Sequence, residues 1–206
     1  MPEAKIELDF KTPLELLVAV ILSAQCTDKR VNLVTPALFL KFPSASAYAA
    51  AQPAELERYI KSCGFFRTKA KSIQSVARTL LEQHHGEVPQ RRDALEALPG
   101  VGRKTAGVVA IQLGTDEAFP VDTHVGRLAR RMGFTKELDP DKVEADLQAL
   151  VPRALWTQGH QLLVWHGRRT CAARSPACER CGVLTDCPRV GVAKKGDRLL
   201  FHSVTQ

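Results

Sequence analysis

The chain has 206 residues, of which 45% are apolar and 25% charged, and this composition excludes an intrinsically disordered protein. Its longest apolar run, Leu16–Ser23, is shorter than the ~20 residues that a membrane span needs, and no basic leader or cleavage site flanks it. A net charge of +7 favours a polyanionic partner such as nucleic acid, and the lack of a secretion signal predicts a cytoplasmic protein outside the membrane.

Nearly every segment has apolar residues at three-to-four spacing, and sustained alternating runs are missing, so we predict an all-α fold. The first helix begins at Thr12-Pro13-Leu14-Glu15, which combines a capping hydroxyl, a proline at the first helical position and a glutamate placed for a capping box. Its body is apolar on all sides and should lie at the centre of a bundle. The tail from 190 to 206 has weak periodicity and receives no assignment. Further helices are predicted at 28–40, 44–51, 54–61, 68–85, 91–97, 103–113, 123–132, 140–151 and 154–169.

A glycine-rich turn, Leu98-Pro99-Gly100-Val101-Gly102, separates two of these helices and is followed by Arg103 and Lys104. The glycines permit a sharp turn with positive φ, while Leu98 and Val101 can enter the core. Such a turn presents backbone N–H groups at a helix N-terminus, which suits a phosphate. From the glycines alone, an ordinary helix-to-helix turn remains the competing interpretation.

Four of the six cysteines, Cys171, Cys178, Cys181 and Cys187, form a compact C-x6-C-x2-C-x5-C run. Without a secretion signal these thiols should stay reduced, and their clustering indicates a metal site. The spacing is compatible with either zinc or an iron-sulfur cluster. The isolated Cys26 and Cys63 are interpreted as small buried hydrophobic residues.

The turn with its basic pair, Asp122 in Val121-Asp122-Thr123-His124-Val125, and the cysteine run together resemble the endonuclease III family of DNA glycosylases. The likeness extends over about residues 6–188. It implies a two-lobed helix-hairpin-helix DNA glycosylase fold. The implied lobes are a helical barrel at 7–116, with the hairpin at about 91–113, and a cluster lobe made of 1–6 and 117–206.

The resemblance implies a bifunctional DNA glycosylase and AP lyase of base excision repair, acting on duplex DNA that contains oxidised pyrimidines or abasic sites. Lys104 would attack C1′ of the sugar, and the resulting imine would allow strand cleavage by β-elimination. Lys104 should therefore be partly desolvated. Asp122 would stabilise positive charge on the sugar or move protons. Considered singly, Lys104 is better explained as a surface lysine, and a helix N-cap is an equally natural interpretation of Asp122.

The same resemblance assigns DNA contacts and the metal. Gly100, Val101, Gly102 and Arg103 would hold a phosphate, and the segment Ser23-Ala24-Gln25-Cys26-Thr27-Asp28 makes Gln25 the residue that fills the gap left by an everted base. Phe65, in Gly64-Phe65-Phe66-Arg67, would be the intercalating wedge, with a core aromatic as the alternative. His124 would hydrogen-bond near Asp122 or line the base pocket, although its spacing alone favours a structural histidine. The four cysteines would hold a [4Fe-4S] cluster that presents Arg174, and the preceding Arg168 and Arg169, to phosphates.

The chain also departs from the family pattern. Residues 5–10 resemble the region that follows the family's first helix, so we expect that helix to be missing here. Gly107 stands where the family often has asparagine, and a glycine inside a helix costs about 1 kcal/mol. Two rival functions are an adenine-mismatch glycosylase without lyase activity, which Lys104 opposes, and a noncatalytic metal-stabilised DNA-binding module. We expect a monomer associated with the nucleoid of a prokaryote.

Overall fold

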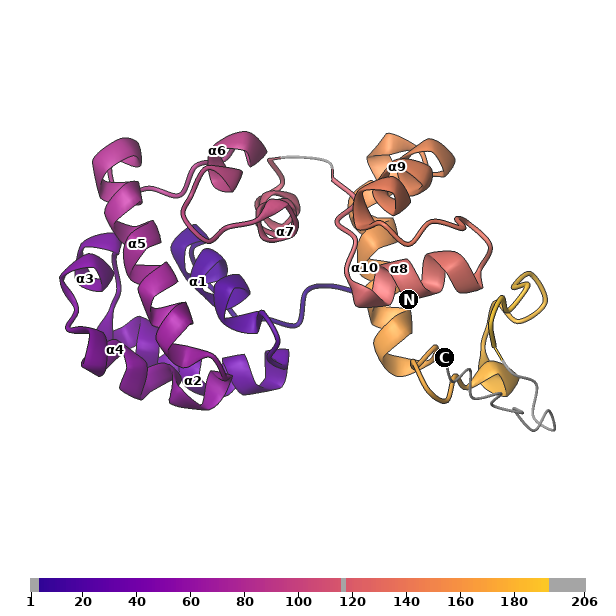
Figure 1. The fold of residues 1–206 in the computed structure, drawn as a ribbon, viewed down its shortest axis with the longest axis horizontal. Helices are drawn as coiled ribbons and strands as arrows, with labels where there is room; N and C mark the ends of the chain where they lie inside the picture. Colours follow the sequence, from indigo (N-terminus) through magenta and orange to yellow (C-terminus); the bar gives the residue numbers. More distant parts are fainter. Residues whose placement is uncertain (1–3, 116–117, 193–206) are drawn as a thin grey trace, which may run out of the picture.

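The computed structural model describes residues 4–115 and 118–192, and every regular element within these ranges is a helix, as the sequence predicts. The expected lobe junction at 116–117, residues 1–3 and the tail beyond 192 lie outside the described residues. Helices α1 to α7 form one lobe, and α8 to α10 form a second beside it with the cysteine segment (Figure 1). None of the described helices combines the length and apolar character needed to cross a membrane. The α-helices are α1 Pro13–Ser23, α2 Asp28–Lys41, α3 Ala45–Ala50, α4 Pro53–Ile60, α5 Phe66–His84, α6 Arg92–Glu96, α7 Arg103–Leu113, α8 Thr123–Arg131, α9 Pro140–Leu150 and α10 Trp156–Arg169, and the short 3-10 helices are η1 Lys61–Cys63, η2 Arg153–Leu155 and η3 Cys178–Arg180.

Helix α1 is the centre of the first lobe, as predicted from its apolar sequence. The Thr12 side chain caps its N-terminus by accepting a hydrogen bond from the Glu15 backbone N–H at 3.2 Å. Every residue from 16 to 22 is buried. Because burying one large aliphatic side chain stabilises a fold by about 1.5–3 kcal/mol, this helix contributes much of the lobe's hydrophobic stabilisation.

The second lobe has a core of its own. Phe119, Val125, Ala129, Val143 and Leu147 pack into a buried cluster separate from the core around α1. Each lobe therefore buries its own apolar surface, and the boundary between them is free to carry polar groups.

The hairpin of the first lobe is tied to α9 of the second by a buried carboxylate. Glu144 is 4% exposed, and its carboxylate forms ion pairs with Arg92 Nη1 at 3.4 Å and Arg103 Nη2 at 3.2 Å. A buried carboxylate requires such partners, since an unpaired charge at this depth would be strongly destabilising. The pairing helps to hold the hairpin against the second lobe.

Candidate active site

A cavity of about 220 Å³ lies between the two lobes and is lined by residues from both. Lys104 contributes from α7, Asp122 from the segment that precedes α8, and Gln25 from the loop between α1 and α2. The structure therefore brings together three residues that the sequence analysis selected from distant segments. His160 and Arg168, both on α10, line the same cavity and were not selected as pocket residues.

Asp122 is the N-cap of α8. Its Oδ1 accepts a hydrogen bond from the Val125 backbone N–H at 2.8 Å, and its backbone is extended, with φ of −101° and ψ of −175°. The N-cap interpretation of this residue is therefore correct, and it does not conflict with a role in the cavity. The hydrogen bond to the helix N-terminus fixes the direction of this carboxylate.

Lys104 is the second residue of α7 and lies at the cavity with its side chain exposed. The partial desolvation expected from the sequence is absent in the chain alone, because the cavity is open at this side. A bound substrate would have to supply the exclusion of water that favours a neutral amine.

The turn between α6 and α7 has the buried anchors that the sequence predicts, with Leu98 at 2% and Val101 at 4% exposure. Of the two glycines, only Gly100 has a positive φ, of 78°. Gly102 has a φ of −82° and serves as the N-cap of α7, so the positive φ of the predicted sharp turn is supplied by Gly100. No side chain caps α7, and the first N–H groups of this helix remain available for an anion.

Arg103 follows the turn but is directed toward the second lobe. Besides Glu144, its guanidinium contacts Asp141 Oδ1 at 3.3 Å. In the chain alone Arg103 therefore holds the lobes together, and a phosphate contact from its side chain would require these ion pairs to rearrange.

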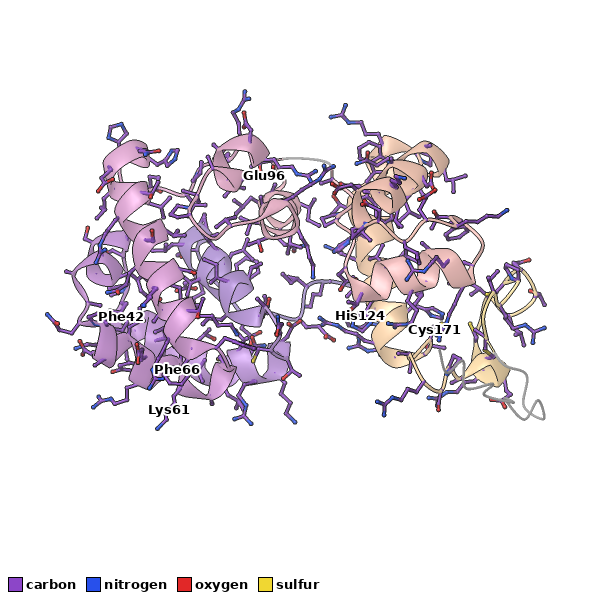
Figure 2. The ribbon with its side chains drawn as sticks, in the orientation of Figure 1. Phe42, Lys61, Phe66, Glu96, His124 and Cys171 are labelled. Carbon is purple, nitrogen blue, oxygen red and sulfur yellow. The ribbon has the colours of Figure 1, made fainter. Side chains whose placement is uncertain are left out.

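The two loops predicted to insert into DNA share a strained backbone geometry. Gln25 has a φ of 52° and Phe65 a φ of 45°, both in the left-handed region that non-glycine residues seldom adopt. Phe65 is 67% exposed, which excludes the alternative of a core aromatic. Its neighbour Phe66, labelled in Figure 2, begins α5 and packs against the core of the first lobe.

A buried lysine joins the bases of these two loops. Lys69 is 5% exposed, and its Nζ donates to the carbonyl oxygens of Leu22 at 2.8 Å and Cys63 at 2.7 Å. Burial lowers the pKa of Lys69. The sequence analysis missed this residue because a lysine in an amphipathic helix normally lies on the solvent side.

His124 is not among the residues that line the cavity, and its position fits the structural alternative. The side chain lies between α8 and α10, where Nδ1 is 3.1 Å from Arg127 Nη2 (Figure 2). A Cβ atom on Gly167 of α10 would come within 3.0 Å of the His124 Cβ, so the helices pack closely at this point. Burial lowers the pKa of His124.

The expected role of Arg168 and Arg169 as phosphate contacts is also not seen in the chain alone. Arg168 forms ion pairs with Glu7 and, at 2.7 Å, with Asp28 Oδ2 at the start of α2. Arg169 pairs with Glu7 at 2.5 Å and lies over the ring of Trp165. These contacts connect α10 to the N-terminal segment and to the first lobe beside the cavity.

The four clustered cysteines line a common apolar cavity in the second lobe, on the side where Cys171 is labelled in Figure 2. Three thiols have polar neighbours. Arg131 Nη1 lies 3.3 Å from Cys171 Sγ, His166 Nε2 lies 3.6 Å from Cys181 Sγ, and Cys187 Sγ lies 3.7 Å from the Arg131 carbonyl oxygen. Within 4–115 and 118–192, no three His, Cys, Asp or Glu side chains converge closely enough to hold a single metal ion. Arg174 is exposed on the loop after Cys171.

The two isolated cysteines lie in the first lobe, as predicted. Cys63 is 1% exposed and Cys26 is half-buried against the core. Burial and the neighbouring Cys26 raise the pKa of Cys63 to about 11, so this thiol is inert.

Comparisons with known proteins agree with this arrangement. Residues 18–153 match the family described as HhH-GPD superfamily base excision DNA repair protein. The chain is 51% identical to Endonuclease III of Synechocystis over 91% of its length and 86% of the relative, and 44% identical to Endonuclease III of Escherichia coli over 87% and 85%.

Solved structures give the same result. A trapped covalent intermediate of Endonuclease III with DNA superposes with a TM-score of 0.88 at 43% identity, covering 91% of this chain and 89% of the other. A thermostable thymine-DNA glycosylase superposes with a TM-score of 0.80 at 26% identity, covering 87% and 85%.

Proposed function

The chain belongs to the HhH-GPD superfamily of base excision DNA repair proteins, and we propose that it removes oxidised pyrimidines from duplex DNA with Lys104 as the nucleophile. It is a DNA glycosylase and AP lyase, as its similarity to several Endonuclease III proteins indicates. A close structural likeness to Endonuclease III in complex with DNA supports DNA as the substrate.

The observation that carries the assignment of the nucleophile is the shared cavity of Lys104 and Asp122. The neutral amine attacks C1′, and the N-glycosidic bond breaks as the base leaves with the bonding electron pair and gains a proton. Opening of the sugar ring gives an imine. Loss of a C2′ proton then moves an electron pair into the C2′–C3′ bond and expels the 3′ phosphate.

Asp122 faces the positive charge that develops on the sugar during base departure. The Asp122 side chain is suited to this task because its hydrogen bond to the Val125 N–H fixes it in place before the reaction. We assign electrostatic stabilisation to Asp122, since its N-cap bond holds the carboxylate in a fixed position at the cavity.

The cavity is accessible to a sugar only after the nucleotide rotates out of the duplex. Gln25 and Phe65 occupy exposed loop tips that are anchored at their bases by Lys69, which supports their insertion into the space left behind. The free N–H groups of α7 after Gly102 are suited to a neighbouring phosphate. Arg174, exposed near the cysteines, is suited to a second phosphate.

We further propose that Cys171, Cys178, Cys181 and Cys187 hold a [4Fe-4S] cluster. All four line one apolar cavity. Their spacing fits zinc or a cluster, and the similarity to Endonuclease III proteins supports the cluster, because the C-x6-C-x2-C-x5-C run resembles that family's ligation pattern. When bound, the cluster cross-links the segment that carries Arg174. No step of base removal depends on it.

Borohydride trapping tests the nucleophile. The reagent reduces the imine to a stable amine, so wild-type protein and duplex DNA with one thymine glycol should give a covalent complex. Lys104→Gln should give none, while the exposed Lys136→Gln on the second lobe should trap normally. Base release at the wild-type rate by Lys104→Gln would remove Lys104 from the chemical step. An active wild-type protein that forms no adduct would reject the imine mechanism.

A further inference from the structure

His160 is a buried histidine at the wall of the cavity that holds Lys104 and Asp122. It lies on α10, is 7% exposed, and meets the ring of Phe119 edge-on. Its Nδ1 is 2.8 Å from the carbonyl oxygen of Pro120. Because a carbonyl oxygen only accepts hydrogen bonds, Nδ1 carries the proton and donates it to Pro120.

The opposite ring nitrogen remains available to the cavity. Nε2 of His160 has no hydrogen-bond partner among the residues that the structure describes. In that part of the chain the one fully buried side-chain polar atom without a partner is the Tyr48 hydroxyl, so Nε2 retains some exposed surface. Nε2 is therefore not fully enclosed, and His160 is one of the residues that line the cavity. In the neutral ring, Nε2 is an acceptor.

Several charges act on this ring. Burial lowers the pKa of His160, and Lys104 on α7 and Arg168 on α10 lower it further. The Asp122 carboxylate before α8 and the Pro120 carbonyl act to raise the pKa of His160, but it remains below its ordinary value of 6.5. The imidazole is therefore mostly neutral at pH 7.

We infer that His160 is a positioning residue for the reaction under "Proposed function", on which this inference rests. Its Nδ1–H holds the Pro120 carbonyl and so fixes the segment that carries Asp122. Its Nε2 accepts a hydrogen bond from the Lys104 amine when that side chain turns into the cavity. An amine that donates one N–H in this way has a fixed orientation, and so has its lone pair. The lone pair is what attacks C1′.

Two substitutions separate the functions of the two nitrogens. In His160→Asn the amide nitrogen can occupy the place of Nδ1, so the bond to Pro120 is retained and the acceptor at Nε2 is lost. In His160→Gln the amide reaches the place of Nε2, so an acceptor is retained and the bond to Pro120 is lost. His85→Asn is the matched control, because His85 is exposed and its left-handed backbone suits asparagine.

The experiment uses the purified, cluster-loaded proteins and duplex DNA with one abasic site. Single-turnover imine formation is measured by borohydride trapping from pH 5 to 8, alongside thermal unfolding and affinity for a tetrahydrofuran abasic analogue. We expect His160→Asn to unfold and bind as wild type does but to form the imine about tenfold more slowly at pH 7.5, as the loss of one hydrogen bond predicts. His160→Gln should unfold at a lower temperature and lose less of the imine-forming rate than His160→Asn.

The pH profile distinguishes positioning by Nε2 from a purely structural role. As the pH falls through a pKa below 6.5, the wild-type ring gains a proton and Nε2 ceases to accept, so the ratio of wild-type to His160→Asn rates should fall toward one. A constant ratio, or a rate for His160→Asn within twofold of wild type at pH 7.5, would overturn the inference. Absence of any trapped adduct with wild type would instead reject the proposed function.

Discussion

Gly107 and Pro120 approach each other so closely that a Cβ atom on Gly107 would lie 3.0 Å from Pro120 Cγ. The contact joins α7, which carries Lys104, to the segment that carries Asp122. It gives a packing reason for a glycine inside a helix. Since the Pro120 carbonyl is also the acceptor for His160 Nδ1, Pro120 contacts both α7 and α10.

Gly107→Ala should therefore destabilise the protein despite the better helix propensity of alanine. Propensity contributes up to about 1 kcal/mol, whereas overpacking against a rigid proline ring costs about 1–3 kcal/mol. We expect a net loss near 1 kcal/mol, seen as a fall in Tm of about 2–4 °C, together with slower imine formation. A variant that is more stable than wild type and equally active would show that Pro120 moves freely.

Asp122→Asn should separate helix capping from chemistry. Asparagine caps a helix about as well as aspartate, so thermal unfolding should change little. Loss of the charge should reduce the single-turnover rate of base release by about 100-fold or more. Asp122→Ala is the control that loses both the charge and the helix cap. Its free energy of unfolding should also be lower, by about 1 kcal/mol. Base release by Asp122→Asn at the wild-type rate would exclude electrostatic stabilisation by this carboxylate.

Lys69→Met should weaken both stability and DNA binding. The substitution leaves the carbonyls of Leu22 and Cys63 without a donor, at a cost of about 1–3 kcal/mol for each buried group left unpaired. The loops of Gln25 and Phe65 lose their common anchor, so affinity for duplex containing an abasic analogue should fall more than affinity for undamaged duplex. Lys71→Met, exposed on the same helix, is the control and should resemble wild type in both assays.

The ion pairs of Glu7 should make stability depend on acid pH. Burial acts to raise the pKa of Glu7, but hydrogen bonds from Arg169 and Arg168 outweigh it, and the pKa lies below its ordinary value of 4.5. The stabilisation is therefore complete above pH 4.5 and is lost as the pH falls through the lower pKa of the folded protein. The difference in Tm between wild type and Glu7→Gln should shrink below pH 4.5. A difference that is independent of pH would exclude this ionisation as its cause.

Replacing one cluster ligand should affect the second lobe selectively. Cys178→Ser should contain less iron and lose visible iron-sulfur absorption, and protease should cleave the 171–187 segment sooner. The core around α1 is separate and should keep its protection from hydrogen exchange. Cys26→Ser, in the first lobe, should keep the wild-type iron content. Full iron content in Cys178→Ser would remove Cys178 from the ligand set.

Much of the fold could be predicted because its signals are local. The buried body of α1, the Thr12 cap and the turn anchors Leu98 and Val101 each depend on neighbours within a few residues. The helix ends differ from prediction by one or two residues, as in α5, which begins at Phe66. The strained backbone of Phe65 sets that start, and no residue pattern signals it.

The cavity was only partly predictable. Lys104, Asp122 and Gln25 were found through motifs, but His160 was not, because its partner Pro120 is 40 residues away and no local spacing relates them. For His124 the sequence leaves both a pocket role and a structural role open. The close packing of α8 on α10 at Gly167 directs it elsewhere.

The sequence by itself determined the helical content, the hairpin turn, the four-cysteine segment and the chemical types available for catalysis, since each follows from residue identity and short-range spacing. Tertiary structure alone decided which arginines are already paired across the lobes, which histidine reaches the cavity and how open Lys104 is to water. Those properties depend on the approach of surfaces that are distant along the chain, where burial and charge are set by the partner and not by the residue itself.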